Sequence, residues 1–463
     1  MSAAEAPSQT NPEIQKLLDV ARDALELARQ RGAQQADAVA NRGTEFEVKV
    51  ADGEIVNLTQ ATSKGLGVRV FVDQRLGFCT LSDFSRASVI QGVERAIAMA
   101  KESAPDPNNG LADAKPGHIS AGDALDLFDP AIPALDAEQK IEWAHALEAA
   151  ARKVDPAVCK FRDSGVASGE EASVLVTSTG AERSIRSTGI SIWCNPIASR
   201  DGELQTEVWF DSKTHLEDLD SVDAVGRTAG QRAFRMLGAK PVKTQQCPII
   251  WEPAMAAGLV GGVLGAIDGD MVYKRASFLS DKLGERIATD RITLVDDPWL
   301  PRGVASMPFD GEGLKTYRKN LLDSGRVTTF LYDTYTARKA GVQSTANAQR
   351  SFASLPHAGC FNVYVQPGSD VPEDIIRNTQ RGLLVTRGMG SGVNLVTGEY
   401  SRGANGLWIE NGEVVHPVQE VTIAGDYVTM LQNIDRIGSD FHMRGARGAP
   451  TLRVAEMTVS GSG

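Results

Sequence analysis

The feature that most constrains the fold is a switch in hydrophobic period, from helical to strand-like, that occurs twice in the first half of the chain. In residues 12–30 the apolar side chains recur at the spacing of one helix face, and after residue 46 they alternate with polar ones. The same order of patterns returns after residue 135. This order predicts an α+β fold in which antiparallel or mixed sheets carry flanking helices.

The first pattern is predicted to form an N-terminal α+β unit over residues 12–104. Asn11 is typical of a helix start, because its side chain can accept a backbone N–H bond from the first turn. The Asp52-Gly53 pair predicts a hairpin turn between two alternating strands, and a second helix completes the unit. Residues 1–11 are predicted to be a flexible tail.

The second pattern is predicted to form a middle α+β unit over residues 135–240. A stretch rich in Pro, Asp, Gly and Ala, residues 105–134, precedes it and is predicted to be a linker. Residues 245–460 are glycine-rich with short apolar runs, and predict a larger, β-dominated C-terminal domain. In the middle unit Asp136 is a predicted helix cap, and the predicted strands are at about 159–167, 172–178, 187–195 and 203–211.

Charge and cysteine content exclude several classes of protein. The chain has 48 Lys and Arg against 59 Asp and Glu, a formal net charge of −11, and almost all of the acidic excess lies in residues 1–240. Nucleic acids and anionic membranes bind basic surfaces, so we expect neither as a partner. The five cysteines form no C-x-x-C pair, and the sequence shows no export signal and no apolar span, so we expect a soluble cytoplasmic protein.

Known catalytic motifs are missing from the sequence. It contains no H-E-x-x-H, no G-x-S-x-G elbow, no Walker loop and no strand-embedded dinucleotide fingerprint. The six histidines are far apart. We therefore assign no catalytic residue and no metal ligand.

One predicted helix, over residues 254–267, carries glycines on a single face. They are Gly258, Gly262 and Gly265. Because glycine inside a helix costs about 1 kcal/mol relative to alanine, this face is expected either to make a tight contact or to border a cavity.

Several long runs of residues resemble one known family. Residues 309–313 read Phe-Asp-Gly-Glu-Gly, and residues 359–365 read Gly-Cys-Phe-Asn-Val-Tyr-Val. Residues 390–413 read Gly-Ser-Gly-Val-Asn-Leu-Val-Thr-Gly-Glu-Tyr-Ser-Arg-Gly-Ala-Asn-Gly-Leu-Trp-Ile-Glu-Asn-Gly-Glu. With these runs the chain resembles the TldD/PmbA family, also called modulators of DNA gyrase, and within it the PmbA (TldE) branch. The resemblance covers nearly the whole chain.

The resemblance implies a subunit of a bacterial, cytoplasmic, two-component zinc metallopeptidase. In that family the TldD-type subunit carries H-E-x-x-x-H on a helix and a later cysteine. The PmbA-type subunit pairs with it and encloses an unfolded peptide substrate. The family complex degrades flexible polypeptides and trims leader peptides from peptide-antibiotic precursors.

This chain departs from the catalytic branch at the metal positions. The segment that corresponds to H-E-x-x-x-H begins at Glu252 and ends at Ala257, and residues 442–449 contain no cysteine where the late cysteine would stand. Catalytic zinc needs three protein ligands. We therefore expect no metal and no other cofactor in this chain, which would complete the substrate chamber, and we expect zinc in a TldD-type partner.

Three residues are predicted to face the peptide substrate or the partner: Tyr400, Arg402 and Asn405. They lie in a strongly patterned stretch, residues 398–408, whose strands are predicted to offer a free edge to an extended peptide. Residues 245–460 are nearly neutral overall, which by itself does not locate an interface. The resemblance implies that these residues build the contact with a TldD-type subunit, and that the chain alone forms a homodimer.

Two alternatives remain open. In the first alternative, the chain is an autonomous peptidase with a site unlike that of the family. A perturbed thiol or a His–Asp pair inside a cavity would favour this alternative. In the second alternative, the chain is a chaperone-like, homodimeric peptide-binding protein. Zinc content and peptidase activity, measured with and without a TldD-type partner, distinguish the three possibilities.

Overall fold

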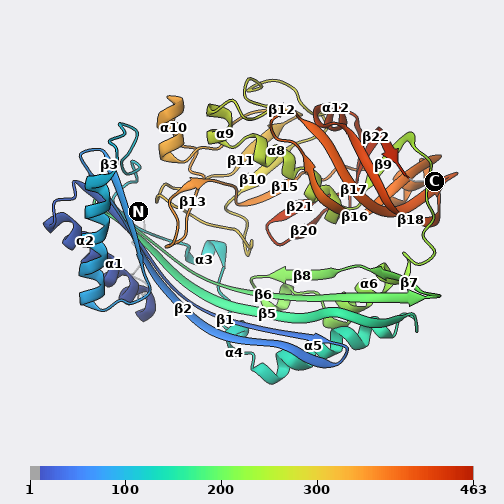
Figure 1. Cartoon of the computed structure of the whole chain (residues 1–463), viewed down its shortest axis with the longest axis horizontal. Helices are drawn as coiled ribbons and strands as arrows, with labels where there is room; N and C mark the ends of the chain where they lie inside the picture. Colours follow the sequence, from blue (N-terminus) through green and yellow to red (C-terminus); the bar gives the residue numbers. More distant parts are fainter. Residues whose placement is uncertain (1–10, 462–463) are drawn as a thin grey trace, which may run out of the picture.

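The structure, a computed structural model, describes residues 11–461 and has a long curved sheet that faces a β-rich C-terminal half (Figure 1). The path through this sheet is β3-β2-β1-β5-β6-β4, and β7 and β8 also pair with β6. The residues of the predicted tail before Asn11 lie outside the described residues. The strands of the long sheet are β1 (Gln35–Ala51), β2 (Glu54–Val72), β3 (Arg75–Leu81), β4 (Gly117–Ser120), β5 (Val158–Thr177), β6 (Ala181–Arg200), β7 (Glu203–Thr206) and β8 (Trp209–Lys213).

Helices cover one face of the long sheet in two groups, and each group buries its own apolar core. Alternate residues of β1, among them Phe46, Val48 and Val50, point into the core beneath α5 and α6. None of the helices within residues 11–461 has the length and apolarity needed to cross a bilayer. The first group is α1 (Pro12–Gln30) and α2 (Arg86–Glu102), the second is α4 (Ala131–Ala134), α5 (Ala137–Arg152) and α6 (Val222–Phe234), and the short elements α3 (Gly122–Leu125) and η1 (Leu216–Asp218) lie in connecting segments.

The C-terminal half contains two six-stranded sheets around one large apolar core. One sheet has the order β18-β17-β16-β9-β22-β19 and the other has the order β12-β11-β10-β15-β21-β20, whereas β13 and β14 pair only with each other. The strands are β9 (Gln245–Trp251), β10 (Leu294–Asp297), β11 (Lys319–Asp323), β12 (Arg326–Val327), β13 (Ala348–Gln349), β14 (His357–Ala358), β15 (Asn362–Val365), β16 (Arg381–Val393), β17 (Glu399–Glu410), β18 (Glu413–Asp426), β19 (Ile434–Ile437), β20 (His442–Arg444), β21 (Arg447–Ala449) and β22 (Leu452–Ser460). The helices are α7 (Pro253–Leu259), α8 (Gly261–Ala266), α9 (Gly269–Tyr273), α10 (Thr334–Ala340), α11 (Pro372–Arg377) and α12 (Tyr427–Gln432).

The α+β class predicted from the sequence is confirmed. Both predicted caps are present: Asn11 accepts the Glu13 N–H at 2.8 Å, and Asp136 accepts the Gln139 N–H at 2.7 Å. The two N-terminal units share one sheet, because β1 pairs with β2 on one side and with β5 on the other. The segment predicted as a linker, residues 105–134, contributes β4 to that sheet. The domain boundaries themselves stay predictions.

A buried group of charged side chains joins the long sheet to the C-terminal half. Asp37 on β1 accepts hydrogen bonds from Arg69 of β2 and, at 2.7 Å, from Arg350 of the loop after β13. Arg69 also lies 3.5 Å from Glu312. Burial by itself would raise the pKa of Asp37, but the Arg350 and Arg69 guanidinium groups together hold it below its usual value.

Candidate functional site

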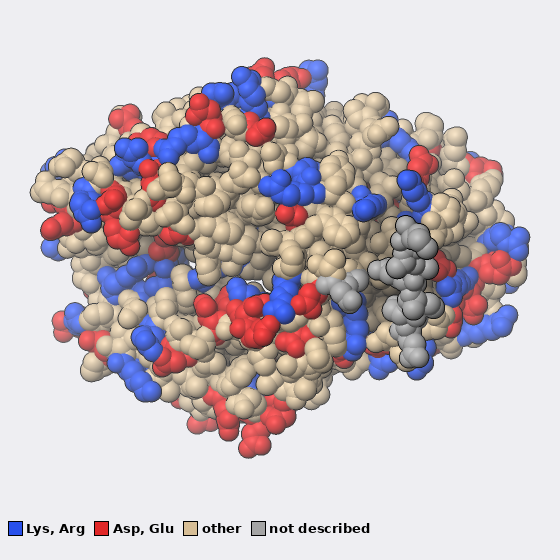
Figure 2. Space-filling model, turned by 180° about the vertical axis from the view of Figure 1, so that it is seen from behind, with Lys and Arg blue, Asp and Glu red and all other residues tan. Residues whose placement is uncertain are grey.

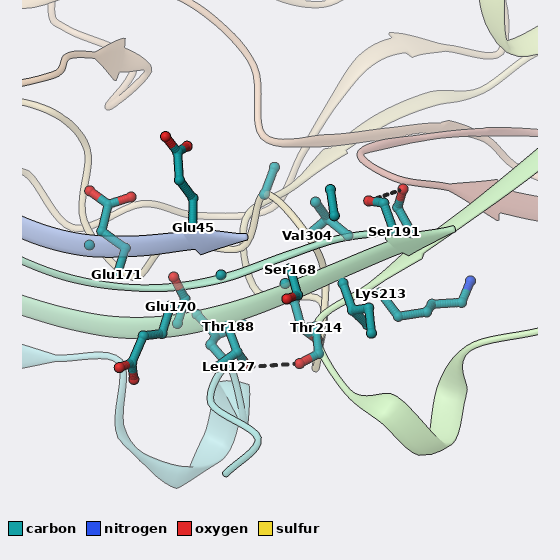
Figure 3. A pocket seen from close by; sticks show the side chains of 18 of the residues that line it. Glu45, Leu127, Ser168, Glu170, Glu171, Thr188, Ser191, Lys213, Thr214 and Val304 are labelled. Atoms are coloured by element: carbon teal, nitrogen blue, oxygen red, sulfur yellow. Dashed lines mark hydrogen bonds between the residues drawn. The ribbon is translucent and has the colours of Figure 1, made fainter. Parts of the chain in front are cut away.

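A cleft of about 710 Å³ lies between the inner face of the long sheet and the C-terminal half (Figure 3). Strands β1, β5, β6 and β8 form its floor. The loop of residues 303–307, together with Gln349 and Phe361, forms the opposite wall. The two walls come from different halves of the chain, so the contacts between the halves determine the shape of the cleft.

Small side chains make up much of the floor. Strand pairing aligns Glu45 of β1, Gly169 of β5 and Gly189 of β6 in one row across the sheet. In the next row Ser191 shares a hydrogen bond of 2.7 Å with Ser212 of β8. A Cβ atom at Gly189 would meet no atom within 4 Å. The floor therefore leaves room for a ligand to lie directly over the sheet.

A second cavity of about 300 Å³ adjoins the first and extends toward the Asp37–Arg350 pair. Asn41, Glu171 and Met307 line both cavities, so the two form one continuous site. An apolar wall with a few polar groups is typical of a ligand site. The apolar side chains of the second cavity are those of Val39, Val174, Leu175, Ile185, Met307, Phe309, Phe352 and Phe361.

Most polar groups of the cleft are hydroxyls, and its charged groups are four glutamates and Lys213. Figure 3 shows Glu45 and Glu171 pointing into the space above the sheet, whereas Glu170 points to the other side. Asn41 donates to Glu171 at 3.0 Å, and its own side-chain oxygen is buried with no hydrogen-bond partner. Seen from behind, acidic and basic side chains lie next to one another along the hollow between the two halves (Figure 2). The cleft is therefore suited to ligands that supply N–H donors.

The potentially reactive side chains of the cleft are hydroxyls, carboxylates and Lys213. Among the described residues, no histidine and no cysteine lines either cavity. The hydroxyl of Thr188 already donates to the backbone oxygen of Thr214 at 2.9 Å. A hydroxyl nucleophile needs a neighbouring base, and the lining residues offer no such pair.

Two arginines form ion pairs with Glu252, which begins the segment that the resemblance relates to a metal-binding helix. Glu252 lies directly before α7, and its carboxylate is 2.5 Å from Arg232 and 3.5 Å from Arg235 at the end of α6. Arg232 also stacks on the Trp209 ring at 4.6 Å and lies 3.6 Å from the buried Glu207. Burial is the main influence on Glu207 and raises its pKa. This cluster joins α6 and β8 of the long sheet to the start of α7.

The hairpin of β20 and β21 packs against α7, so the structure brings together the two segments that the resemblance relates to metal ligands. From this hairpin Arg444 donates to the Phe210 backbone oxygen at 2.6 Å and stacks on Trp209 at 3.4 Å. Burial, reinforced by the Arg444 charge, lowers the pKa of His442.

These residues do not fit a catalytic zinc site. Two guanidinium groups already pair with the Glu252 carboxylate, and Ala257 has only a methyl group where the resemblance places a histidine. Within residues 11–461, no three His, Cys, Asp or Glu side chains lie close enough together to hold a metal ion. Arg232 and Arg235 would also repel a divalent cation.

The three residues predicted to face a peptide lie in β17, and the first of them is buried. Tyr400 is 4% exposed, its ring stacks on Tyr427 at 6.1 Å, and it meets Trp251 edge to face at 6.3 Å. Burial raises the pKa of Tyr400 to about 12. The prediction that Tyr400 faces a peptide or a partner is therefore wrong, because its ring is part of the core of the C-terminal half.

Arg402 and Asn405 are half-buried within the same sheet. A Cβ atom at Gly388 would lie 2.6 Å from the Arg402 guanidinium carbon, so Arg402 lies across the backbone of β16. Asn405 accepts the Glu420 N–H at 3.0 Å. Strand β17 pairs with β16 on one side and with β18 on the other. The predicted free edge at residues 398–408 is therefore wrong, since both edges of the strand already have partners.

The predicted glycine-faced helix is two short helices, α7 and α8. A Cβ atom at Gly262 would lie 2.8 Å from the Tyr427 ring, and one at Gly265 would lie 2.9 Å from Leu395. At Gly258 the nearest atom would be 3.7 Å away. The tight contact is confirmed at Gly262 and Gly265, whereas Gly258 has ordinary packing space.

Replacing Gly262 with leucine is expected to lower the free energy of unfolding by about 1–3 kcal/mol, because the new side chain would overlap Tyr427. Urea unfolding measures the change. Gly261→Leu is the matched control, since a Cβ atom at this neighbouring position would meet no atom within 4 Å. If Gly262→Leu were as stable as the original chain, this face of α8 would have room for a side chain.

The cleft was not predictable from the sequence. Its floor combines β1 with β5 and β6, which lie more than a hundred residues later in the chain, and no local motif marks such a surface. One local signal was present in the sequence: Glu45 and Glu47 alternate with the apolar Phe46 and Val48, which is typical of a strand with one polar face.

Comparisons with known proteins add a family context to this geometry. Three successive segments match the PmbA/TldA metallopeptidase domains: residues 36–103 match domain 1, residues 130–237 the central domain, and residues 244–461 the C-terminal domain. Metalloprotease PmbA of Escherichia coli O157:H7 is 32% identical to this chain, and the match covers 98% of each of the two chains.

Solved structures share the whole fold. A putative modulator of DNA gyrase from Bacteroides thetaiotaomicron superposes with a TM-score of 0.88 at 27% identity, covering 96% of this chain and 98% of that one. TldE from Thermococcus kodakarensis superposes with a TM-score of 0.84 at 24% identity, covering 95% of this chain and 99% of that one, and at this identity the likeness concerns the fold alone.

Proposed function

The chain belongs to the PmbA/TldA metallopeptidase family, on its PmbA branch, and from this we propose that it is the non-catalytic subunit of a two-component zinc peptidase. The observation that carries the proposal is the chemistry at the start of α7. Glu252 is paired with Arg232 and Arg235, and Ala257 supplies no ligand. The zinc would be held by a TldD-type partner, and this chain would contain no cofactor of its own.

In this proposal the cleft is the part of the subunit that holds substrate. An extended peptide supplies backbone N–H groups, for which the Glu45 and Glu171 carboxylates are acceptors. The small residues of the floor leave space for side chains of different sizes. Such a site suits a cytoplasmic complex that degrades flexible polypeptides and trims leader peptides, because it binds with little dependence on sequence.

An autonomous peptidase is the second candidate, and Cys360 is the residue in the family-like runs that would favour it. Burial raises the pKa of Cys360 to about 12, so the thiol is protonated at neutral pH. The thiolate is the nucleophilic form of cysteine. Among the described residues, Cys360 also does not line either cavity. These observations favour the non-catalytic role.

The purified chain is expected to contain far less than one zinc ion per molecule and to cleave flexible peptides only when mixed with a TldD-type subunit. Elemental analysis after dialysis and a fluorogenic peptide assay measure the two quantities. The TldD-type subunit alone, and each mixture with a chelator added, are the controls. Zinc near one per chain that survives dialysis, or cleavage by this chain alone, would contradict the proposal.

A further inference from the structure

The inner face of the long sheet changes from apolar to polar along its strands. Val39 of β1 faces Leu175 of β5, and in the next row Ser173 faces Ile185 of β6. The row of Glu45, with its two glycines, lies two rows beyond. The second cavity therefore lies over mainly apolar positions of the sheet, and the larger cavity lies over small and polar ones.

The second cavity is an apolar space that the protein leaves unfilled. Packed protein interiors contain few voids larger than a water molecule, whereas this cavity measures about 300 Å³. Space with apolar walls is poorly suited to water and takes apolar groups instead. The apolar residues that line it come from both halves of the chain, and those that are buried include Val39, Leu175, Ile185, Phe309 and Phe361.

The charged groups at the inner end of this cavity are already satisfied within the protein. The Arg350 side chain is completely buried and pairs with Asp37 at 2.7 Å. Both oxygens of Asp310 accept backbone N–H groups, at distances of 2.9–3.2 Å. Burial, reinforced by the Glu312 charge, raises the pKa of Asp310 and so favours its uncharged form. The inner end therefore offers little to a charged ligand.

The residues shared with the larger cavity form the mouth of the second one. Among them Glu171 is the only charged residue, and its carboxylate accepts a hydrogen bond from Asn41 at 3.0 Å. A group that enters the second cavity from the cleft therefore lies beside a carboxylate. This carboxylate repels acidic side chains and leaves neutral ones unaffected.

We propose that the second cavity binds one large apolar side chain, aromatic or long aliphatic, of a peptide whose backbone lies over the cleft floor. The inference rests on the proposed function and adds one point of sequence preference to it, since the other contacts of the cleft go to the peptide backbone. Neighbouring side chains of an extended peptide point to opposite sides. One side chain can therefore enter the cavity while the next points away from the sheet.

Three fluorescent peptides of Gly and Ser that differ only in one central residue test the preference. They carry Phe, Ala or Glu, and fluorescence anisotropy measures their affinity for the full chain bound to a metal-free TldD-type partner. The Phe peptide should bind about tenfold or more tightly than the Ala peptide, because it buries an aromatic side chain, and the Glu peptide should bind no better than the Ala peptide. Equal affinities for the Phe and Ala peptides would overturn the inference alone. Failure of all three to bind would contradict the proposed function and the inference with it.

A variant that fills the second cavity shows whether the preference arises there. Ser173 lines only this cavity, so Ser173→Phe should occupy it and leave the larger cavity open. This variant should bind the Phe and Ala peptides equally, at the affinity of the original chain for the Ala peptide. Ser82→Phe is the matched control, since it adds the same ring at an exposed serine that lines neither cavity, and it should keep the preference. A folded Ser173→Phe chain that still prefers the Phe peptide tenfold would overturn the inference.

A photochemical cross-link gives a second readout that requires no variant of the chain. A leucine analogue that carries a diazirine replaces the central residue of the peptide. On irradiation it should attach to the cavity wall at Met307, Phe309 or Phe352, where mass spectrometry locates the bond. Excess Phe peptide should suppress this product, and excess Ala peptide should suppress it less. Attachment only to the partner, or only to residues outside the second cavity, would overturn the inference.

Discussion

Replacing Asp37 with alanine is expected to lower the free energy of unfolding by about 3–5 kcal/mol, because it leaves two buried guanidinium groups without their shared carboxylate. The Arg350 side chain is completely buried and that of Arg69 is 6% exposed, so water cannot replace the lost partner. Urea unfolding at neutral pH measures the loss. Asp374→Ala removes an exposed ion pair with Arg377 and should leave the stability nearly unchanged.

The ionised Asp37 carboxylate should also make the free energy of unfolding depend on pH. The pKa of Asp37 is lowered from 3.8 in the folded chain, where the two arginines outweigh the opposing effect of burial. Such a group adds stability above its unfolded pKa, and this contribution is lost as the pH falls through the folded pKa. The difference between the original chain and Asp37→Ala should therefore narrow in acid. A difference that is equal at about pH 7 and about pH 3 would contradict the role given to the ionised carboxylate.

Replacing Gly189 with tryptophan is expected to weaken the retention of a flexible peptide by about tenfold or more, because the indole would occupy the floor of the cleft. The backbone at this position accepts a side chain, and a Cβ atom would have no neighbour within 4 Å, so the fold should persist. Fluorescence anisotropy of a labelled unfolded peptide measures the affinity, with the TldD-type partner present and its metal removed.

The matched control is Gly261→Trp, which adds the same ring at another open glycine, outside the cleft lining. It should leave peptide affinity unchanged. A folded Gly189→Trp chain that retains peptide normally would exclude the cleft as the substrate site. Loss of peptide affinity in both variants would show that the added indole ring weakens binding by an effect that does not depend on its position in the cleft.

The ends of helices were predictable from local sequence, because a cap depends on one side chain and the next three residues. Asn11 and Asp136 accept the N–H bonds expected of them. The Asp52-Gly53 turn is also present between β1 and β2, with both residues in the left-handed region at φ 52° and 85°. The glycine at this place relieves the strain that a side chain would add.

Strand lengths were not predictable from the same local patterns. Residues 159–167 and 172–178 were expected to be separate strands, yet β5 runs unbroken from Val158 to Thr177. The intervening Ser168-Gly169-Glu170-Glu171 has the composition of a turn. These residues continue the strand because they pair with β1 on one side and with β6 on the other, and because the Glu171 side chain lies in the cleft. Pairing with distant strands outweighs local preference.

Tyr400 was wrongly predicted to face a peptide for a related reason. A patterned stretch such as residues 398–408 contains a tyrosine, an arginine and an asparagine, residue types that are common on binding surfaces. Their burial depends on β16 and β18, which pair with both edges of β17.

The shared sheet also sets the order in which the chain can fold during synthesis. Asp37 of β1 faces Thr177 of β5 across the sheet. The ion-pair partner of Asp37 is Arg350, which lies 313 residues after Asp37 in the chain. A ribosome therefore releases β1 long before either partner exists. Contacts of such long sequence separation slow folding, and the edge of β1 that later pairs with β5 stays unpaired on the nascent chain, where it is prone to aggregation. The strand that forms part of the cleft floor is thus among the first to be made and the last to be completed.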